Sequence, residues 1–285
     1  MKRDSKVRTI TWGNMSGPSH HAPSWYLDPL VAEQKRKLNQ DWIRTATGNR
    51  SRGVVLKTDL FEEAYGADRV FDDLFPDMRL AVGMDLDHPT ALAAWRRHSP
   101  AFHSIACDAR HLAFRSASMD LVISPSTLDH FECAQDLAAS LDELARVLRP
   151  GGILLISLDN PQNPLYHLLR WVSRRGWTPY SLGQTVSLSS LAGMLVERGF
   201  RIETTRYLIH NPRGISTALF LALRKGFGRF ASAPIRGLLG VFAVFGALPS
   251  RSLTGCFLAV SAIKQPVLKE HDAAPVEASS GAGPR

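Results

Sequence analysis

The stretch ELARVLRPGGILLISLDNP, residues 143–161, decides the fold of this chain. Its first half has the apolar spacing of a helix, which Pro150 and the two glycines after it bring to an end. A short apolar run follows, of the length of a buried strand, and it closes on Asp159 and Asn160. We therefore expect a helix over 134–148, a strand over 153–158 and polar side chains directly after the strand.

Strand and helix signals alternate in the same way along most of the chain. The amphipathic stretch 26–46 predicts a helix, and its start, Asp28-Pro29, has an N-cap residue followed by proline. Short apolar strands separated by helices pair in parallel, with both faces of the sheet covered, so the pattern indicates an α/β, doubly wound fold. Strands are expected over 53–58, 79–85, 102–107, 119–124, 153–158, 200–207 and 255–263, and further helices near 66–75, 89–98 and 187–198.

Composition limits the classes of protein to which the chain can belong. The three cysteines among 285 residues are far apart, so a disulfide framework is not expected and a reducing, cytoplasmic compartment is favoured. The basic N-terminal residues have no apolar stretch behind them, and no apolar run reaches the roughly 18 residues of a membrane span. Neither HExxH nor a paired CxxC occurs, so no metal is expected. These features indicate a soluble or peripheral protein.

The net charge of +8 is unevenly distributed along the chain. Between Pro161 and Gln265 there are 13 Lys and Arg against two acids, which gives +11 and leaves −3 for the remainder. A solvated basic face accounts for this as well as an anionic partner does, such as a membrane surface or an acidic substrate. Nucleic acid is not expected as a partner, because no recognition motif accompanies the charge.

One apolar segment, 209–253, interrupts the alternation before the last strand. It is rich in Leu, Phe, Ala and Gly, with arginines on both sides. Three interpretations stay open: two helices packed on the domain, a hydrophobic cap over an apolar substrate, or a stretch lying in a membrane interface. We expect a flexible arm over 1–24, a single domain over 25–264 that includes this insertion, and a disordered tail over 265–285.

Ligands of doubly wound sheets bind beyond the carboxyl ends of the strands, so the residues that follow each strand are candidates for a site. Asp85 ends the second expected strand, with Leu86 beside it, and can accept hydrogen bonds from both hydroxyls of a ribose. Asp108 ends the third strand and can accept a hydrogen bond from an adenine amino group, with the backbone N–H of Ala109 next to it for a ring nitrogen. Two such acids on neighbouring strands are a stronger signal than either one alone.

These pieces together resemble a known family, the class I S-adenosylmethionine-dependent methyltransferases and in particular their type 11 group. The resemblance covers roughly residues 50–207 and 252–264, and VLRPGG is its most specific motif. It implies a mostly parallel seven-stranded sheet with an antiparallel last strand, and S-adenosylmethionine as the cofactor. It also implies a ribose contact at Asp85, adenine contacts at Asp108 and Ala109, and a place near the reacting methyl for Ser124. The segments that carry it are AVGMDLD, IACDARHLAF, MDLVISPSTLDHF, ELARVLRPGGILLISLDNP and LTGCFLAVSAIK.

The turn after the first strand departs from the family pattern, acid-x-Gly-x-Gly-x-Gly. Aligned on Val55-Leu56, the acid becomes Lys57 and the first glycine becomes Asp59, with Thr58 between them. We expect a wider turn, because residues with a Cβ resist positive φ. Lys57 could pair with the cofactor's carboxylate, and Asp59 with its ammonium or sulfonium. Alternatively, Lys57 and Asp59 pair with each other in a fold that no longer binds the cofactor.

Methyl transfer is an in-line displacement at a carbon that positive sulfur activates, so the protein contributes mainly alignment. A general base is needed only where the acceptor must lose a proton. His130 is the candidate, because a histidine titrates near neutrality and this one follows the fourth strand; Asp129 could orient it or cap the next helix. A structural or substrate-packing role for His130 stays open.

The predicted function is that of an S-adenosylmethionine-dependent methyltransferase acting on an unidentified small molecule, apolar or anionic, in the cytoplasm or at a membrane surface. The alternative is a non-catalytic protein of the same fold that uses 209–253 to bind a membrane or a protein partner. The sequence does not determine the oligomeric state.

Overall fold

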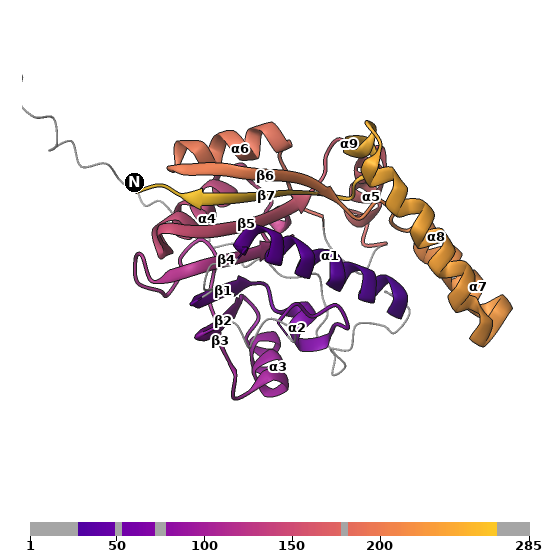
Figure 1. Ribbon diagram of the computed structural model, residues 1–285, viewed down its shortest axis with the longest axis horizontal. Coiled ribbons are helices and arrows are strands. Elements are labelled where there is room, and N and C mark those ends of the chain that lie inside the picture. Colours follow the sequence, from indigo (N-terminus) through magenta and orange to yellow (C-terminus); the bar gives the residue numbers. More distant parts are fainter. Residues whose placement is uncertain (1–27, 49–52, 72–77, 178–181, 267–285) are drawn as a thin grey trace, which may run out of the picture.

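The computed structural model of the chain describes residues 28–48, 53–71, 78–177 and 182–266. The expected arm over 1–24 lies outside these ranges, as does the expected tail apart from its first two residues. The described residues form one seven-stranded sheet with helices on both faces (Figure 1).

The sheet has the strand order β3-β2-β1-β4-β5-β7-β6. Each of β1 to β5 runs parallel to its neighbours among these five, whereas β7 runs antiparallel to both β5 and β6. The expected α/β fold with an antiparallel last strand is thus confirmed. The strands are β1 Val54–Thr58, β2 Leu80–Asp85, β3 Phe102–Ala106, β4 Met119–Pro125, β5 Leu148–Asp159, β6 Phe200–Leu208 and β7 Phe257–Lys264.

Helices cover both faces of the sheet through two separate cores. On one face, Trp42 and Ile43 of α1 and Ala94 of α3 pack against the strands, and the indole N–H of Trp42 donates to Ser261 Oγ at 2.8 Å. On the other face, α4 and α6 bury their leucines. The α-helices are α1 Pro29–Thr47, α2 Phe61–Tyr65, α3 His88–His98, α4 Ala134–Val147, α5 Pro164–Ser173, α6 Leu188–Glu197, α7 Ile215–Phe227, α8 Ser232–Val244 and α9 Arg251–Thr254; the 3-10 turns are η2 Leu128–His130, η3 Gly228–Ala231 and η4 Phe245–Ala247.

Three elements differ from the sequence-based expectation. The helix expected over 66–75 is wrong, because α2 ends at Tyr65 and residues 66–71 are not helical. Strand β5 begins at Leu148 instead of residue 153. The strand runs on through residues 149–152 because Gly151 takes a φ of 79°, in the left-handed region that favours glycine. Helix α5 was not expected, although Asn163 caps it and proline occupies its first turn.

The segment over 209–253 forms a helical hairpin, α7–α8, that leaves the sheet after β6 and returns to β7. Arg224 on α7 donates to Ser232 at the start of α8, and Gly246 in η4, directly after α8, lies against His210 before α7, so the two helices run antiparallel. By length and composition, the helical run Ile215–Ala247 could cross a membrane. In the structure, however, Gly228 takes a φ of 51° and reverses the chain, which leaves two helices of 13 residues each.

The parallel strands bring their carboxyl ends to one edge of the sheet. Strand β6 ends and β7 begins at this same edge, where Phe257 pairs with Asp159 of β5 and Leu208 of β6. The hairpin therefore projects from the edge that carries the candidate site, and Figure 1 shows it extending beyond the sheet.

Candidate active site

The turn after β1 has the backbone of a glycine turn without the glycine. Asp59 adopts a φ of 63°, in the left-handed region, and its Oδ1 accepts a hydrogen bond from the N–H of Phe61 at 2.9 Å. We expected a Cβ to prevent this conformation. Aspartate tolerates it because its short side chain bonds to the nearby backbone. Burial raises the pKa of Asp59 to about 7, with the charges of Glu62 and Asp85 adding to the effect and Lys57 opposing it.

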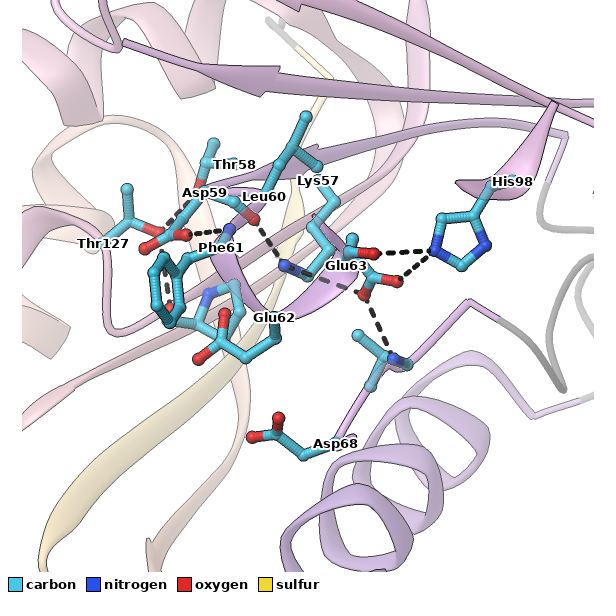
Figure 2. A network of polar contacts seen from close by, with 12 residues as sticks. Lys57, Thr58, Asp59, Leu60, Phe61, Glu62, Glu63, Asp68, His98 and Thr127 are labelled. Carbon is cyan, nitrogen blue, oxygen red and sulfur yellow. Dashed lines mark hydrogen bonds and ion pairs between the residues drawn. The ribbon is translucent and has the colours of Figure 1, made fainter. Parts of the chain in front are cut away.

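Lys57 points into a buried polar network under α2 (Figure 2). Its side chain is 1% exposed; Nζ donates to the backbone oxygen of Asp59 and lies 3.8 Å from Glu63 Oε1. Glu63 is also buried, lies 3.3 Å from His98 Nε2 and accepts the N–H of Val70. The partners of Lys57 are thus the Asp59 carbonyl and Glu63, and its pairing with a cofactor carboxylate stays a prediction.

Three hydroxyls converge where β1 and β4 end. Thr58 Oγ1 donates to Ser124 Oγ at 2.9 Å and lies 2.8 Å from Thr127 Oγ1. Thr58 and Ser124 are both fully buried. Their hydrogen bonds tie the first-strand turn to β4, which is the position that the resemblance assigns to the neighbourhood of the reacting methyl.

Asp85 holds the first-strand turn in place. Its Oδ2 accepts from the N–H of Leu60 at 2.9 Å and its Oδ1 from the N–H of Asp87 at 2.8 Å, while Leu86 between them is 46% exposed. Burial raises the pKa of Asp85, against these two N–H donors, which lower it. A carboxylate has about four acceptor positions, so Asp85 retains capacity for further donors such as ribose hydroxyls.

Asp108 follows β3 next to Asp85, as the N–H of Cys107 donating to the Asp85 carbonyl shows. Its carboxylate forms an ion pair with Arg110, 2.6 Å from Nη2 to Oδ2, and the same guanidinium forms a second ion pair with Asp136 at 3.0 Å. Burial opposes ionisation, but the hydrogen bonds from Arg110 lower the pKa of Asp108. An adenine amino group would share this carboxylate with Arg110. Ala109 is buried beside them.

A second carboxylate lies between the ends of β4 and β5. Asp129 Oδ2 accepts from the Ser126 hydroxyl at 2.9 Å and from the N–H of Asp159 at 2.6 Å. Its Oδ1 is buried without a hydrogen-bond partner among the described residues. Burial raises the pKa of Asp129 to about 6; the charge of Asp159 adds to this, and His130 opposes it. A carboxyl that titrates near neutrality beside a half-buried histidine suits proton transfer.

The sequence did not distinguish the roles suggested for Asp129. Helix α4 begins after Cys133, so Asp129 does not cap it. The backbone oxygen of Asp129 accepts the N–H of Gly183, and a Cβ at Gly183 would lie 2.5 Å from the backbone of His130. The 182–184 segment therefore fixes the η2 turn that carries Asp129 and His130.

A pocket opens at this edge between α1, α2, the ends of β4 and β5 and the roots of the hairpin. Lys35 of α1 crosses it and pairs with Glu62 at 3.0 Å and Asp68 at 2.6 Å. Burial raises the pKa of Glu62, but the charges of Lys35 and Lys57 outweigh burial and lower this pKa to about 2. Sequence analysis missed these charged residues, because on α1 and α2 they resemble an ordinary solvated face. The polar lining comprises Lys35, Asn39, Lys57, Glu62, Asp68, Ser126 and Ser157.

Comparison with known proteins gives a domain match for part of the chain and a shared fold for most of it. Residues 63–156 match the family model described as "Methyltransferase domain". The solved structure of Haemonchus contortus phospholethanolamine N-methyltransferase 2, a complex with S-adenosylhomocysteine, aligns with a TM-score of 0.54 at 18% identity over 81% of this chain and 53% of that one. Residues 63–156 thus match a methyltransferase domain in sequence, and the chain has the fold of the class I S-adenosylmethionine-dependent methyltransferases.

Other similar proteins lie in the same family of folds. A putative sarcosine dimethylglycine methyltransferase from Galdieria sulphuraria aligns with a TM-score of 0.57 at 14% identity, over 83% of this chain and 87% of that one. A probable S-adenosylmethionine-dependent methyltransferase of Mycolicibacterium smegmatis is 27% identical over 163 residues, 52% of each protein. The mouse tRNA (carboxymethyluridine(34)-5-O)-methyltransferase is 46% identical over 55 residues, which span 19% of this chain and 8% of that protein. The chain thus spans about half or less of the length of these curated relatives.

The residues at this edge of the sheet have the groups that the nucleoside end of S-adenosylmethionine requires. Two carboxylates at the ends of neighbouring strands can accept hydrogen bonds from a diol and an amino group, and the turn beside them has glycine-like backbone geometry at Asp59. Among the described residues, no group of three or more His, Cys, Asp or Glu could hold a metal ion.

Proposed function

We propose that the chain transfers a methyl group from S-adenosylmethionine to an unidentified small-molecule acceptor. The observation that carries the proposal is the position of Asp85 and Asp108 at adjoining strand ends, next to a first-strand turn that keeps left-handed geometry at Asp59. The methyltransferase-domain match over residues 63–156 and the shared fold support the cofactor. Asp85 would hold the ribose, and Asp108 with Ala109 the adenine.

When bound, S-adenosylmethionine supplies a methyl group activated by a positive sulfur. The chain's own residues then bind and orient, and alignment of this kind can contribute about 7–11 kcal/mol to lowering the barrier. The acceptor would enter the pocket lined by Ser126, Ser157 and the ion-paired residues Lys35, Glu62 and Asp68. His130, next to the buried Asp129, would accept a proton from acceptors that must lose one.

The titration of Asp59 gives the proposal a pH dependence. Because the pKa of Asp59 is raised to about 7, its carboxylate is mostly neutral at pH 6 and mostly ionised at pH 8. If the ionised form contacts the ammonium or sulfonium of the cofactor, affinity should rise across this interval. Asp59→Asn should bind with an affinity that no longer changes between pH 6 and pH 8.

Isothermal titration with S-adenosylmethionine tests the proposal. Wild type is expected to bind, Asp85→Ala to lose binding and Lys57→Ala to bind more weakly. Asp142→Ala is the control, since this acid is 65% exposed on α4 and should leave binding unchanged. If folded wild type gives no heat of binding at millimolar cofactor, the proposal that the chain is an enzyme is wrong.

The alternative is a non-catalytic protein of the methyltransferase fold. The intramolecular partners of Lys57 and Asp108 favour it, since both side chains already have neighbours of opposite charge. Arg110→Ala distinguishes the two functions, because it frees the carboxylate of Asp108. If the chain binds S-adenosylmethionine, this variant should bind it at least as tightly as wild type does. An acceptor search by untargeted metabolite comparison between a deletion strain and its parent, with a total tRNA pool as a second arm, would identify the substrate class.

A further inference from the structure

The α7–α8 hairpin concentrates the exposed apolar surface of the described chain. Nine of its seventeen exposed large hydrophobic side chains fall between residues 215 and 253. The two at the tip are among the most exposed, Phe227 at 58% and Phe230 at 68%. Exposed apolar patches of this kind mark a surface that binds another protein or a membrane.

Among the described residues, α1 covers one side of the hairpin. Phe220, Ile235 and Leu239 pack with Val31 of α1 in a small separate core. Arg224 adds an ion pair with Asp28, 2.7 Å from Nε to Oδ2, so the hairpin is held to the start of α1. The tip beyond Arg224 is exposed throughout residues 225–230.

The charge on this surface has one sign. Between residues 204 and 266 the chain has eight Lys and Arg and no Asp or Glu. At the tip, KGFGRF (225–230), Lys225 precedes Phe227 and Arg229 lies between the two phenylalanines, and both cations are exposed. Aromatic side chains with adjacent cations favour the interface of a bilayer that carries anionic headgroups.

The length of the helices limits how the hairpin can meet a bilayer. Each helix has 13 residues, about 20 Å at 1.5 Å per residue, whereas the hydrocarbon core is about 30 Å thick. Gly228 reverses the chain between them, with the cations Lys225 and Arg229 beside it. A surface-bound hairpin, with its tip in the headgroup region, satisfies these dimensions.

We propose that the α7–α8 hairpin binds an anionic phospholipid surface, with Phe227 and Phe230 inserted at the interface and Lys225 and Arg229 paired with lipid headgroups. This inference does not depend on the proposed catalytic activity. It places the sheet edge from which the hairpin projects toward the membrane.

Co-sedimentation of the full chain with phosphatidylglycerol/phosphatidylcholine vesicles tests the proposal, against pure phosphatidylcholine vesicles. Wild type is expected to bind the anionic vesicles and to release them at high salt. The Phe227→Ser/Phe230→Ser variant should bind at least about tenfold more weakly. Lys225→Gln/Arg229→Gln should lose about thirtyfold of the affinity for anionic vesicles.

The matched control is Val196→Ser, which changes a side chain of α6 that is 57% exposed and distant in sequence from the hairpin. It should bind as wild type does. All variants change exposed residues, so circular dichroism and melting temperature should match those of wild type. Binding of the phenylalanine variant with wild-type affinity would overturn the proposal. So would wild type that leaves anionic vesicles unbound at low salt, the result expected if the hairpin instead binds an acidic protein.

Discussion

Asp129 is a buried carboxyl whose ionisation opposes folding, and its replacement by asparagine gives a quantitative test. The side chain is 1% exposed, and burial together with the charge of Asp159 raises its pKa to about 6. An unfolded aspartate titrates near 3.9. Between these values the folded chain binds more protons than the unfolded chain, so the free energy of unfolding decreases as pH rises.

The magnitude follows from the difference between the two pKa values. Two units at about 1.4 kcal/mol each give roughly 3 kcal/mol, present below pH 4 and lost as pH rises through about 6. Asparagine keeps an oxygen that can accept from the Ser126 hydroxyl and the Asp159 N–H, and it does not ionise. Asp129→Asn should therefore match wild type near pH 4 and be more stable than wild type by roughly 3 kcal/mol at pH 7.

Urea unfolding of both proteins at pH 4, 5, 6 and 7 measures this difference directly. Titrating groups that do not interact with Asp129, Asp59 among them, contribute equally to both proteins and cancel in the comparison. Asp142→Asn serves as the control, since its exposed side chain should leave the wild-type pH profile unchanged. Parallel profiles for wild type and Asp129→Asn would refute a raised pKa at Asp129.

Three further substitutions probe the packing around the site, each by urea unfolding. Gly183→Ala places a Cβ 2.5 Å from backbone atoms of the η2 turn and should lower the free energy of unfolding by about 1–3 kcal/mol, whereas Gly193→Ala, with open space around it on α6, should be neutral or stabilising. Ser261→Ala leaves the buried indole N–H of Trp42 without its acceptor and should cost about 1–3 kcal/mol, a loss that should shrink when Trp42 is also changed to Phe. Lys57→Met removes the cation from a buried ion pair and should lower the free energy of unfolding by about 3–5 kcal/mol, so an unchanged free energy of unfolding would contradict the network under α2.

The strands could be predicted from the sequence because each is a short apolar run bounded by polar or turn residues. Six of the seven expected spans agree with the observed strands to within about two residues at each end. The exception is β5, which begins at Leu148 directly after α4 and runs through RPGG (149–152), where the sequence predicted only the end of a helix. Helix α5 has the same signal that identified α1, an N-cap residue before proline, at Asn163-Pro164.

The side-chain partners in the candidate site could not be predicted from the sequence. Spacing placed Asp85 and Asp108 on neighbouring strand ends, but it could not show that Arg110, two residues along, folds back onto Asp108. Nor could it show the direction of Lys57, because a lysine at the end of a strand can extend to solvent or turn inward. Burial of Glu63 decides the direction, since an unpaired carboxylate there would be costly and the ammonium of Lys57 offsets its charge.

The hairpin and the candidate site share an edge of the sheet for a topological reason. Strand β7 inserts between β5 and β6 and runs against both, so β6 ends where β4 and β5 end, and the connection to β7 must start and finish there. Leu208, Ile209 and Phe257, the roots of that connection, line the same pocket as Lys57 and Ser126. A hairpin docked on lipid would hold the mouth of this pocket near the bilayer surface. An acceptor that partitions into lipid would then reach the pocket along the hairpin roots, and we expect turnover of such an acceptor, unlike that of a water-soluble one, to fall when Phe227 and Phe230 are both replaced.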